Sequence, residues 1–534
     1  MKVLKFGGTS VANPEHINKV KSILNHQNKE QIAVVVSAFG GVTDLLLNAS
    51  RSASQQEVSY KNSLKEIEDR HISAIRELIP VKSQSAALSK VKGELNILET
   101  LLEGAYLIGE LTPKLSDKIV SYGELLSSFI ISEFLKSEGL DITFKDSREL
   151  IKTDNNFGRA NVDFNSTNAN CQDFFATNKH QITMLPGFVA SSKSGDLTTL
   201  GRGGSDYTAA IIAAALNADI LEIWTDVSGM YTANPKLVKQ AKCVSNISYQ
   251  EAMELSHFGA KVLYPPTIQP ILGKEIPIAI KNTFDPDSPG TLIAKNNNGN
   301  GKTVRGISHV GNISLLSLEG PGMIGIPGIS KRFFETLSVK NISIVLITQA
   351  SSEHSICVGI ADEDVDLAAE AVNETFEFEI STKKIKPVIV EKDLTIVALV
   401  GDNMKSHQGL SGKMFSTLGK NNVNIRAIAQ GASERNISAV IKKEDVKKAL
   451  NSLHETFFEE NIKQLNLFVM GVGNVGSKFL AQIRQQKKYL KEELKLNVRV
   501  IGISNSRKMA FDESGISLKD WENVLDQGEV ANKE

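Results

Sequence analysis

The first 290 residues or so alternate two hydrophobic patterns. Short runs rich in β-branched and apolar residues recur at IAVVVSA (32–38), QITMLPGFVA (181–190) and ILEIWTD (220–226). Longer segments between them carry apolar residues at the spacing of amphipathic helices. Short strands that alternate with helices are typical of a mostly parallel sheet covered by helices, and we expect that architecture here.

Residues 56–137 depart from this alternation. They are long, charged and nearly free of glycine, and SLKEIEDRHISAIREL (63–78) has apolar residues at helical spacing. We interpret this region as a helical insertion that packs on the sheet or frames a substrate pocket.

An internal repeat follows a polar segment, KNNNGNGK (295–302), that reads as a linker. GPGMIGIPGISKRFFETL (320–337) matches GDNMKSHQGLSGKMFSTL (401–418), and VLITQASSEHSI (345–356) matches RAIAQGASERNI (426–437), both at an offset of 81 residues. Each copy reads strand, glycine-containing turn, helix, strand, strand. A repeat at one fixed offset predicts two copies of one supersecondary unit that pack side by side.

The last segment, LNLFVMGVGNVGSKFLAQI (465–483), reads as a strand, a glycine turn and a helix. Its GVGNVG matches the GxGxxG pattern of dinucleotide-binding turns, through Gly471, Gly473 and Gly476. Because the next strand (497–506) ends without an acidic residue and Arg507 follows it, the pattern favours NADP over NAD. Only 58 residues follow Gly476, whereas a complete dinucleotide fold needs two such halves. We therefore expect no dehydrogenase activity from these residues.

Composition narrows the class of protein. A chain of 534 residues is too long for one core, so several domains are expected. With 60 basic and 61 acidic residues, charge gives no reason to expect nucleic acid or an anionic membrane as partner. Three scattered cysteines predict no metal cluster. We find no signal peptide or membrane span and expect a cytoplasmic protein.

Four glycine turns follow predicted strands in the first region: KFGGTS (5–10), VSAFGGVTD (36–44), LGRGGSDYTAA (200–210) and TDVSGMYTANPK (225–236). Any one of them alone is more often an ordinary tight turn. Together they predict a phosphate cradle, because glycines let backbone N–H groups approach an anion closely. In an open α/β sheet we expect all four at the carboxyl ends of the strands.

Individual residues in these turns allow either a purely structural or a functional interpretation. Lys5, in a strand expected to be central, needs an anionic partner. Arg202 is either a solvated loop residue or a clamp on a carboxylate, and Asp206 either a helix N-terminal charge or a partner of Lys5 or Mg²⁺. Glu124 would be a solvated glutamate unless a substrate ammonium meets it. The sequence lacks the GxxxxGK[ST] motif and the protein-kinase motifs.

The ordered set KFGGTS, VSA…GVTD, GRGGSDYTA, TDVSGMYTANP and FGAKVLYP resembles aspartate kinase of the amino-acid-kinase fold. The repeat resembles the paired ACT regulatory domains of that family. With GVGNVG behind it, the whole chain looks like a threonine-sensitive bifunctional aspartate kinase–homoserine dehydrogenase that is incomplete in its dehydrogenase part. The implied fold class is α/β: a three-layer amino-acid-kinase sandwich, two ACT-like (ferredoxin-like) α+β repeats and a partial Rossmann unit.

The resemblance implies roles for single residues. Lys5, Arg202 and Asp206 would be catalytic, and L-aspartate would be held by Ser37, Thr43, Glu124, Arg202 and Ser205. ATP with Mg²⁺ would be held by Lys5, Gly7, Gly8, Thr225, Asp226, Tyr231, Lys236 and Lys261. NADP(H) would belong only to a full-length dehydrogenase. Asn234 and Tyr264 stand where relatives commonly carry Asp and His, and the resemblance places both on the nucleotide side of the site.

The implied reaction is ATP plus L-aspartate giving ADP and 4-phospho-L-aspartate, the first step of threonine, methionine and lysine biosynthesis. L-Threonine would inhibit it by binding near Asn341, Gln349, Asn424 and Gln430, and the repeat region would join two or more copies of the chain. Alternatives are a kinase for another small amino acid and a non-catalytic amino-acid sensor. The repeat could also be a dimerisation module without a ligand.

The expected domains are a kinase domain (1–294), a linker (295–311), two ACT-like domains (312–390 and 391–463) and an incomplete dinucleotide-binding segment (464–534).

Overall fold

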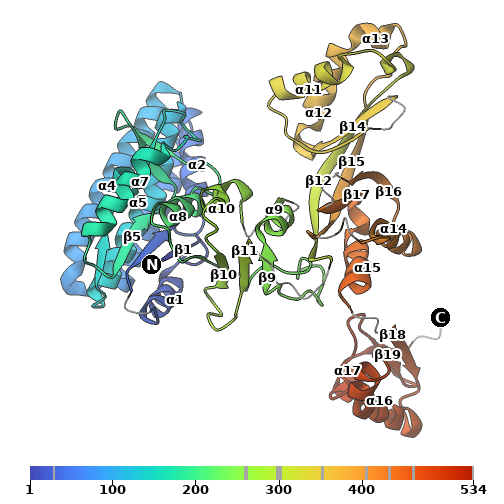
Figure 1. Ribbon diagram of the computed structural model, residues 1–534. Helices are drawn as coiled ribbons and strands as arrows, with labels where there is room; N and C mark the ends of the chain where they lie inside the picture. Colours follow the sequence, from blue (N-terminus) through green and yellow to red (C-terminus); the bar gives the residue numbers. More distant parts are fainter. Residues whose placement is uncertain are drawn as a thin grey trace. The chain divides into compact units, whose positions relative to one another are not determined.

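The computed structural model describes residues 1–27, 30–257, 263–295, 303–349, 354–402, 404, 407–430, 435–459 and 463–531. They form two compact units, residues 1–453 and 454–534. The elements are labelled in Figure 1.

An eight-stranded sheet organises the N-terminal region. Its spatial order is β3 (Ile142–Phe144), β5 (Ile182–Pro186), β2 (Ile32–Val36), β1 (Lys2–Phe6), β8 (Ile220–Thr225), β10 (Ile278–Asn282), β11 (Thr291–Ala294) and β9 (Asn246–Ser248). All neighbours are parallel except β10 and β11. The first strand of the chain, β1, is central: Leu4 lies between Val34 and Glu222 in the register. The expected mostly parallel sheet is confirmed.

Helices cover both faces of this sheet, which gives three layers. Leu4, Phe6 and Val34 pack into a core shared with α1 (Pro14–Asn25), α2 (Val42–Ser54), α3 (Tyr60–Leu78), α4 (Val81–Ile108) and α5 (Pro113–Ser137). Val3, Ala33 and Val35 pack into the opposite core with α7 (Phe164–Thr177), α8 (Gly204–Ala215), α9 (Tyr249–His257), η1 (Pro265–Ile268) and α10 (Gln269–Leu272). The alternation of side chains along each strand is what divides the two cores.

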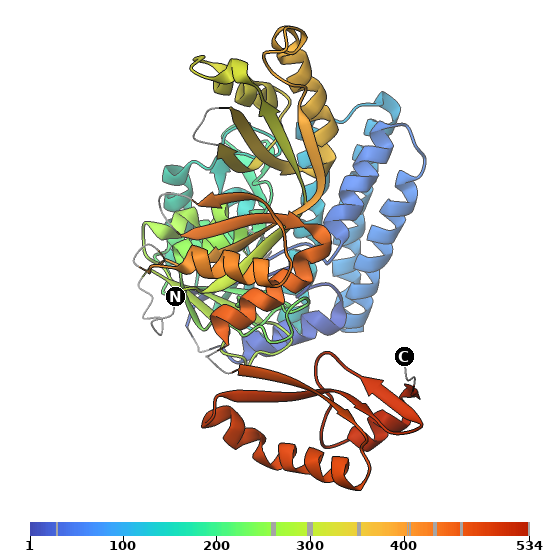
Figure 2. The same cartoon turned by 90° about the vertical axis from the view of Figure 1, so that its right-hand side faces the viewer.

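The helical insertion is confirmed as α3, α4 and α5, which lie side by side in Figure 2 and contact one another. They enlarge the layer on the face of β1 that carries Leu4 and Phe6. The short helix α6 (Ser147–Leu150) and a small sheet, β4 (Lys152–Thr153), β6 (Val189–Ser192) and β7 (Leu197–Thr199), complete the region.

The internal repeat forms one antiparallel sheet of six strands. The order is β13 (Ile344–Gln349), β14 (Ser355–Ala361), β12 (Gly306–Glu319), β15 (Ile389–Val400), β17 (Asn436–Lys442) and β16 (Ile425–Gln430). The helices of the first copy are η2 (Pro321–Met323), α11 (Ile329–Val339), η3 (Asp362–Asp364), α12 (Val365–Thr375) and α13 (Glu377–Ser381). Those of the second are α14 (Leu410–Lys420), η5 (Lys443–Asp445) and α15 (Val446–Phe458).

The two copies exchange strand halves through β12 and β15. Gly306–Val310 pairs with Ile396–Val400, and the second half of β12 pairs with the first half of β15 down to Ser317 and Ile389. Asn312 and Asp393, 81 residues apart, both have positive φ (56° and 58°) where the register shifts. Each long strand therefore serves both copies. Residues 306–311 were expected to be part of a linker, but they form the beginning of β12. The reason is that this strand extends beyond the first copy of the repeat to pair with the second.

The second unit is a small sheet with a helix. β18 (Lys463–Met470) and β19 (Leu496–Ser504) are parallel and joined by α16 (Asn474–Glu492). β20 (Lys508–Phe511), α17 (Trp521–Asp526) and β21 (Glu529–Val530) follow, and β20 and β21 extend the sheet antiparallel. The predicted strand, glycine turn and helix are confirmed.

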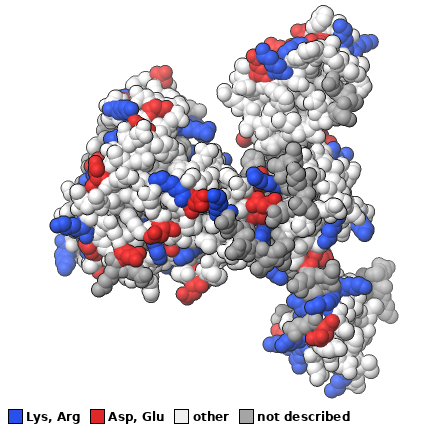
Figure 3. Space-filling model, in the orientation of Figure 1, with Lys and Arg blue, Asp and Glu red and all other residues white. Residues whose placement is uncertain are grey.

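Charges of both signs are interspersed on the face of the molecule that Figure 3 shows. Among the described residues, no helix combines the length and the apolar character needed to cross a membrane.

Candidate active site

Three of the four glycine turns lie where the sequence placed them, at the carboxyl ends of β1, β2 and β8. The expectation for the fourth, residues 200–210, is wrong, because it follows β7 of the small sheet. The reason lies in QITMLPGFVA, which forms β5 and β6 instead of one strand. Phe188 has a positive φ of 68° between them and turns the chain out of the main sheet. The small sheet then brings the turn back to the same edge.

Lys5 is buried, with 8% of its surface exposed, at the end of the central strand. Its Nζ lies 2.7 Å from Oδ1 of Asp206, which comes from the first turn of α8. Gly7 lies beside this ion pair, and an ideal Cβ there would make an ordinary contact of 3.5 Å with the same Nζ. The anionic partner that the sequence required for Lys5 is thus Asp206.

Glu124 of α5 is a buried carboxyl, 5% exposed. It accepts hydrogen bonds from the backbone N–H of Ala38 and the hydroxyl of Ser205. Its Oε2 is buried and has no hydrogen-bond partner among the described residues. Burial raises the pKa of Glu124 to about 8, which outweighs the hydrogen bonds and the nearby charge of Lys5. A buried acceptor without a partner is costly, and a cationic ligand would remove that cost.

Close packing of α5 on the turn after β2 brings Glu124 into this position. An ideal Cβ on Gly123 would lie 2.8 Å from the Cβ of Ala38, so only glycine permits the approach. The hydroxyl of Ser127 donates to the carbonyl of Ser37 at 2.9 Å. On the other side, an ideal Cβ on Gly187 would lie 2.6 Å from the Cβ of Ser205.

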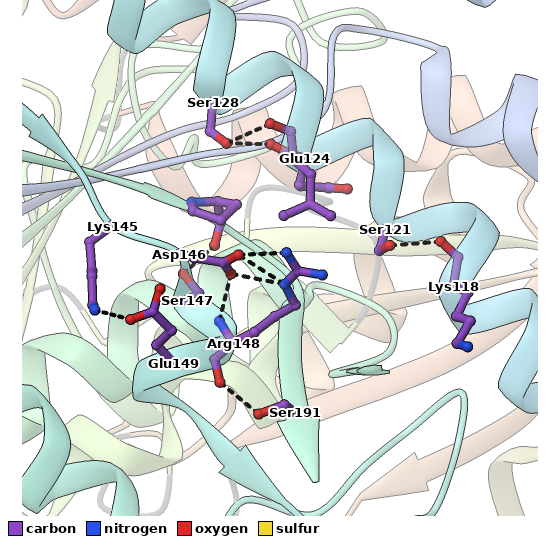
Figure 4. A network of polar contacts seen from close by, with 12 residues as sticks. Lys118, Ser121, Glu124, Ser128, Lys145, Asp146, Ser147, Arg148, Glu149 and Ser191 are labelled. Atoms are coloured by element: carbon purple, nitrogen blue, oxygen red, sulfur yellow. Dashed lines mark hydrogen bonds and ion pairs between the residues drawn. The ribbon is translucent and has the colours of Figure 1, made fainter. Parts of the chain in front are cut away.

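Figure 4 contrasts Glu124 with a nearby network whose charges are paired. Arg148 donates two hydrogen bonds to Asp146 Oδ2, one of them at 2.6 Å, and Lys145 forms an ion pair with Glu149. The contact drawn at Glu124 is the hydroxyl of Ser128 donating to its backbone carbonyl, at 2.6 Å. The charges of this network are thus paired, whereas Oε2 of Glu124 has no hydrogen-bond partner among the described residues.

A cavity of about 460 Å³ joins these groups. It is lined by seven predicted residues, namely Lys5, Ser37, Thr43, Glu124, Arg202, Ser205 and Asp206. The volume falls within the usual range for small-molecule sites.

The sequence analysis missed Asp117, which also lines this cavity and is 2% exposed. Its carboxylate accepts hydrogen bonds from the N–H of Gly158 at 3.0 Å, the N–H of Thr199 at 3.0 Å and the hydroxyl of Thr199 at 2.8 Å. Asp117 thus ties α5 to two loops that wall the cavity. Its place in α5, seven residues before Glu124, is the only sequence signal that could have found it.

Apart from Lys5, the described residues predicted to hold the nucleotide do not line this cavity. Gly7 and Gly8 follow β1, and the hydroxyl of Thr225 donates to Asp226 Oδ1 at 3.2 Å. Tyr231 forms an isolated bridge with Cys243. Lys236 is exposed, and Lys261 lies outside the described residues.

The two residues that depart from the family pattern, Asn234 and Tyr264, lie in different surroundings. Asn234 caps the turn of the nucleotide loop, where its Oδ1 accepts the N–H of Lys236 at 3.0 Å. Tyr264 was expected on the nucleotide side as well, but its ring centroid lies 5.7 Å from the guanidinium of Arg202. The structure therefore links Tyr264 to the cavity.

The predicted effector residues separate into two groups. Gln349 lines a cavity of about 300 Å³ with residues 325–330 of the first copy. Its counterpart Gln430 instead accepts a hydrogen bond from Ser411 at 3.0 Å. Asn341 and Asn424 are exposed and are not equivalent, since the offset of 81 pairs Asn341 with Asn422. Asn341 and Asn422 both have positive φ, at 56° and 53°, so we regard them as turn residues.

In the second unit, the glycines of GVGNVG have the geometry of a tight turn. Gly471 has a φ of 93°, and an ideal Cβ on Gly476 would lie 2.2 Å from the carbonyl oxygen of Gly471. Only glycine therefore lets α16 start this close to β18. Binding of a dinucleotide by Gly471, Gly473 and Gly476 stays a prediction.

The fold and the cavity define a class of architecture: a three-layer α/β domain with a polar cavity at the edge of its sheet, followed by a double α+β repeat. Comparison with known proteins identifies the family. The amino acid kinase family profile matches residues 1–282, and an ACT domain profile matches residues 316–376 and 397–457. The chain belongs to the amino acid kinase family.

Among relatives, the chain is 36% identical over 539 residues to bifunctional aspartokinase/homoserine dehydrogenase 1 of Arabidopsis thaliana, covering 100% of this chain and 59% of the relative. The crystal structure of E. coli aspartokinase III in complex with aspartate and ADP (R-state) is 31% identical, with a TM-score of 0.73. The same enzyme with lysine and aspartate (T-state) is 32% identical, with a TM-score of 0.71. Each comparison covers 86% of this chain and 100% of the solved chain.

These matches confirm the resemblance to bifunctional aspartokinase–homoserine dehydrogenases and the expected fold class. The chain spans about three fifths of the length of the bifunctional relative.

We predict that Glu124→Gln stabilises the protein, and more so as pH rises from 6 to 8. Burial raises the pKa of the folded carboxyl to about 8, whereas the unfolded carboxyl has a pKa near the ordinary value of 4.5. In this window the folded state holds a proton that the unfolded state releases, so wild-type stability falls as pH rises. The advantage of Glu124→Gln should grow by up to about 2 kcal/mol.

Urea unfolding of both proteins at pH 6, 7 and 8 measures this difference. An advantage that stays constant or shrinks over this range would contradict a buried carboxyl. Glu133→Gln on the same helix is a control.

Proposed function

We propose that this protein transfers the γ-phosphoryl group of ATP to the β-carboxylate of L-aspartate, giving ADP and 4-phospho-L-aspartate. The observation that carries the proposal is one cavity that brings together the buried Lys5–Asp206 pair, Arg202 and the buried carboxyl of Glu124, whose Oε2 has no hydrogen-bond partner among the described residues. A free amino acid offers an ammonium for Glu124 and an α-carboxylate for Arg202.

The chemistry fits the absence of a histidine or cysteine among the residues that line the described cavity. The β-carboxylate is ionised at neutral pH, so no base has to remove a proton. One carboxylate oxygen forms a bond to the γ-phosphorus while the bond from that phosphorus to the bridging oxygen of ADP breaks. Catalysis then consists of holding two anions in line and stabilising charge on the moving group.

Lys5 supplies the buried positive charge for that step, and Asp206 orients its ammonium. The Gly7 and Gly8 turn offers backbone N–H groups for the phosphates. ATP would bind as its Mg²⁺ complex, and the ion would offset phosphate charge in the transfer. Thr225, Asp226, Tyr231, Lys236 and Lys261 are proposed to hold the rest of the nucleotide. E. coli aspartokinase III, whose fold this chain shares, has been solved with aspartate and ADP, which supports the same substrates here.

A hydroxamate assay tests the reaction, because hydroxylamine traps an acyl phosphate. We expect product with ATP and L-aspartate, and none with L-glutamate or without an amino acid. Lys5→Met should lower kcat by about 100-fold or more, the scale of losing one charge partner in the transition state.

Product with glutamate at a comparable rate would favour a kinase for another amino acid. No product with any substrate, but binding of aspartate, would favour a sensor. Lys2→Met changes the first residue of β1 and serves as a control for general destabilisation of this strand.

The raised pKa of Glu124 predicts the pH dependence of aspartate binding. A bound ammonium requires the ionised carboxylate, and burial keeps the free carboxyl protonated below about pH 8. The KM for L-aspartate should therefore fall as pH rises from 6.5 to 8, by at most about tenfold per unit, and then level off. In Glu124→Gln, KM should be high and independent of pH over this range.

Initial rates against aspartate concentration at several pH values measure this effect, and the KM for ATP in the same buffers serves as the reference. A wild-type KM for aspartate that is flat with pH would remove Glu124 from the ammonium site.

We also propose that L-threonine inhibits the reaction by binding in the first copy of the repeat. The cavity beside Gln349 is large enough for a small amino acid, at about 300 Å³. In the second copy Ser411 occupies the amide oxygen of Gln430, although the equivalent Ser330 lines the open cavity of the first. The T-state relative holds lysine together with aspartate, which supports an amino acid as effector.

Gln349→Ala should abolish inhibition by threonine, and Gln430→Ala should weaken it less. Activity and melting temperature, measured over a threonine titration of both variants, decide this. If threonine changes neither quantity in the wild type, the effector is wrong. If both variants stay fully inhibited, the proposed cavity is wrong. Sedimentation velocity on the same samples reports whether the sheet edges, β13 and β16, join two copies.

A further inference from the structure

The helix α3 of the insertion reaches the catalytic loops without lining the cavity. Among the described residues, the cavity is lined by side chains from other segments, and none comes from residues 60–78. Instead, Nη2 of Arg70 lies 2.6 Å from the carbonyl oxygen of Gly40 and 3.3 Å from that of Ala12. One guanidinium nitrogen, with its two hydrogens, therefore bridges two backbone carbonyls.

The two carbonyls belong to the glycine loops that follow β1 and β2, and these loops contact each other. An ideal Cβ on Gly40 would lie 2.9 Å from the Cβ of Ala12 and 3.1 Å from the carbonyl oxygen of Gly8. An ideal Cβ on Gly8 would lie 3.3 Å from the carbonyl oxygen of Ala38. With so little space between them, a shift of one loop must displace the other.

The next residue of α3, His71, contacts the loop after β2 through its ring. The ring of His71 stacks on Phe39, with 4.9 Å between centroids and 18° between planes. Its Nδ1 lies 2.6 Å from the carbonyl oxygen of Ile67, and burial lowers the pKa of His71 to about 4. His71 is thus an uncharged packing surface, and the positive charge at this contact belongs to Arg70.

We propose that Arg70 is a positioning residue for the kinase reaction, acting through the carbonyls of Ala12 and Gly40. Because a peptide group is planar and trans, fixing the direction of a carbonyl also fixes the N–H of the next residue, which points the opposite way. The clamp thereby sets the geometry of the loops that carry Gly7 and Gly8 at one substrate and Ser37 and Thr43 at the other. The inference rests on the proposed function for its kinetic consequence only.

Arg70 can also be reached from outside. It lines a second cavity, of about 540 Å³, together with Asn13, Asn62, Lys65 and Asp69. A small cation can therefore enter the space that a truncated Arg70 side chain would leave. This access makes chemical rescue a practical test.

Arg70→Ala should lower kcat in the hydroxamate assay by about 10- to 100-fold, the scale of a small misplacement of reacting groups. Arg70→Lys, which keeps a cationic donor, should retain most of the activity. Guanidinium at low millimolar concentration should restore part of the activity of Arg70→Ala. The matched control is Arg76→Ala, an exposed arginine on the same helix, and its activity should be that of the wild type.

Hydrogen–deuterium exchange gives a readout that does not depend on activity. In Arg70→Ala, amides of segments 7–13 and 38–43 should exchange at least about threefold faster, while those of 204–215 keep their rates. If Arg70→Ala does not fold, Arg70→Met replaces it in both measurements, since its unbranched side chain keeps the packing of the stem.

Two results would overturn the proposal. One is wild-type exchange in both loops of the alanine or methionine variant. The other is a loss of kcat that neither lysine nor guanidinium repairs, which indicates packing alone. A wild-type protein without kinase activity would refute the proposed function, and the exchange measurement would still decide whether Arg70 holds the loops.

Discussion

The structure of the site depends on one constraint: charged groups that are buried at the edge of the main sheet must be balanced there. Lys5 is held in the central strand and forms an ion pair with Asp206 from α8. Glu124 enters from α5, and its Oε2 has no hydrogen-bond partner among the described residues. Three elements distant in sequence are thus fixed around one cavity. A buried polar atom without a partner costs stability in the free protein, and a ligand that pairs with such an atom removes that cost.

The surrounding glycines serve this balance. Gly123 lets α5 approach the turn after β2, and Gly187 does the same for the start of α8. In both places the Cβ of a larger residue would lie closer than 3.0 Å to a neighbouring Cβ, so the packed elements would have to move apart. Gly123 in α5 and Gly187 between β5 and β6 therefore act by close packing, which brings side chains of distant elements together.

Much of this could be predicted from the sequence. The alternation of strands and helices, the insertion and the offset of 81 residues are local patterns, and each has a direct structural equivalent. The five residues expected to hold the amino acid line one cavity together with the expected catalytic residues Lys5 and Asp206, since ordered motifs at strand ends converge in a parallel sheet. Asp117 and Arg70 escaped because their partners are backbone groups of distant loops, which leave no pattern in the sequence. The turn at Phe188 escaped because an apolar residue with positive φ contradicts local preference.

The exchange of strand halves between β12 and β15 has a consequence for the regulatory region. The first half of β12 pairs with the half of β15 that belongs to the second copy, and the first half of β15 pairs with the half of β12 that belongs to the first copy. Asn312 and Asp393, both with positive φ, lie where the strands pass from one copy to the other. Neither repeat is then a module that could be cut out and kept folded. An inserted or deleted residue in either long strand would slip the register of both copies at once. Residues around the cavity of either copy can therefore change independently, whereas the lengths of β12 and β15 are constrained by both copies together.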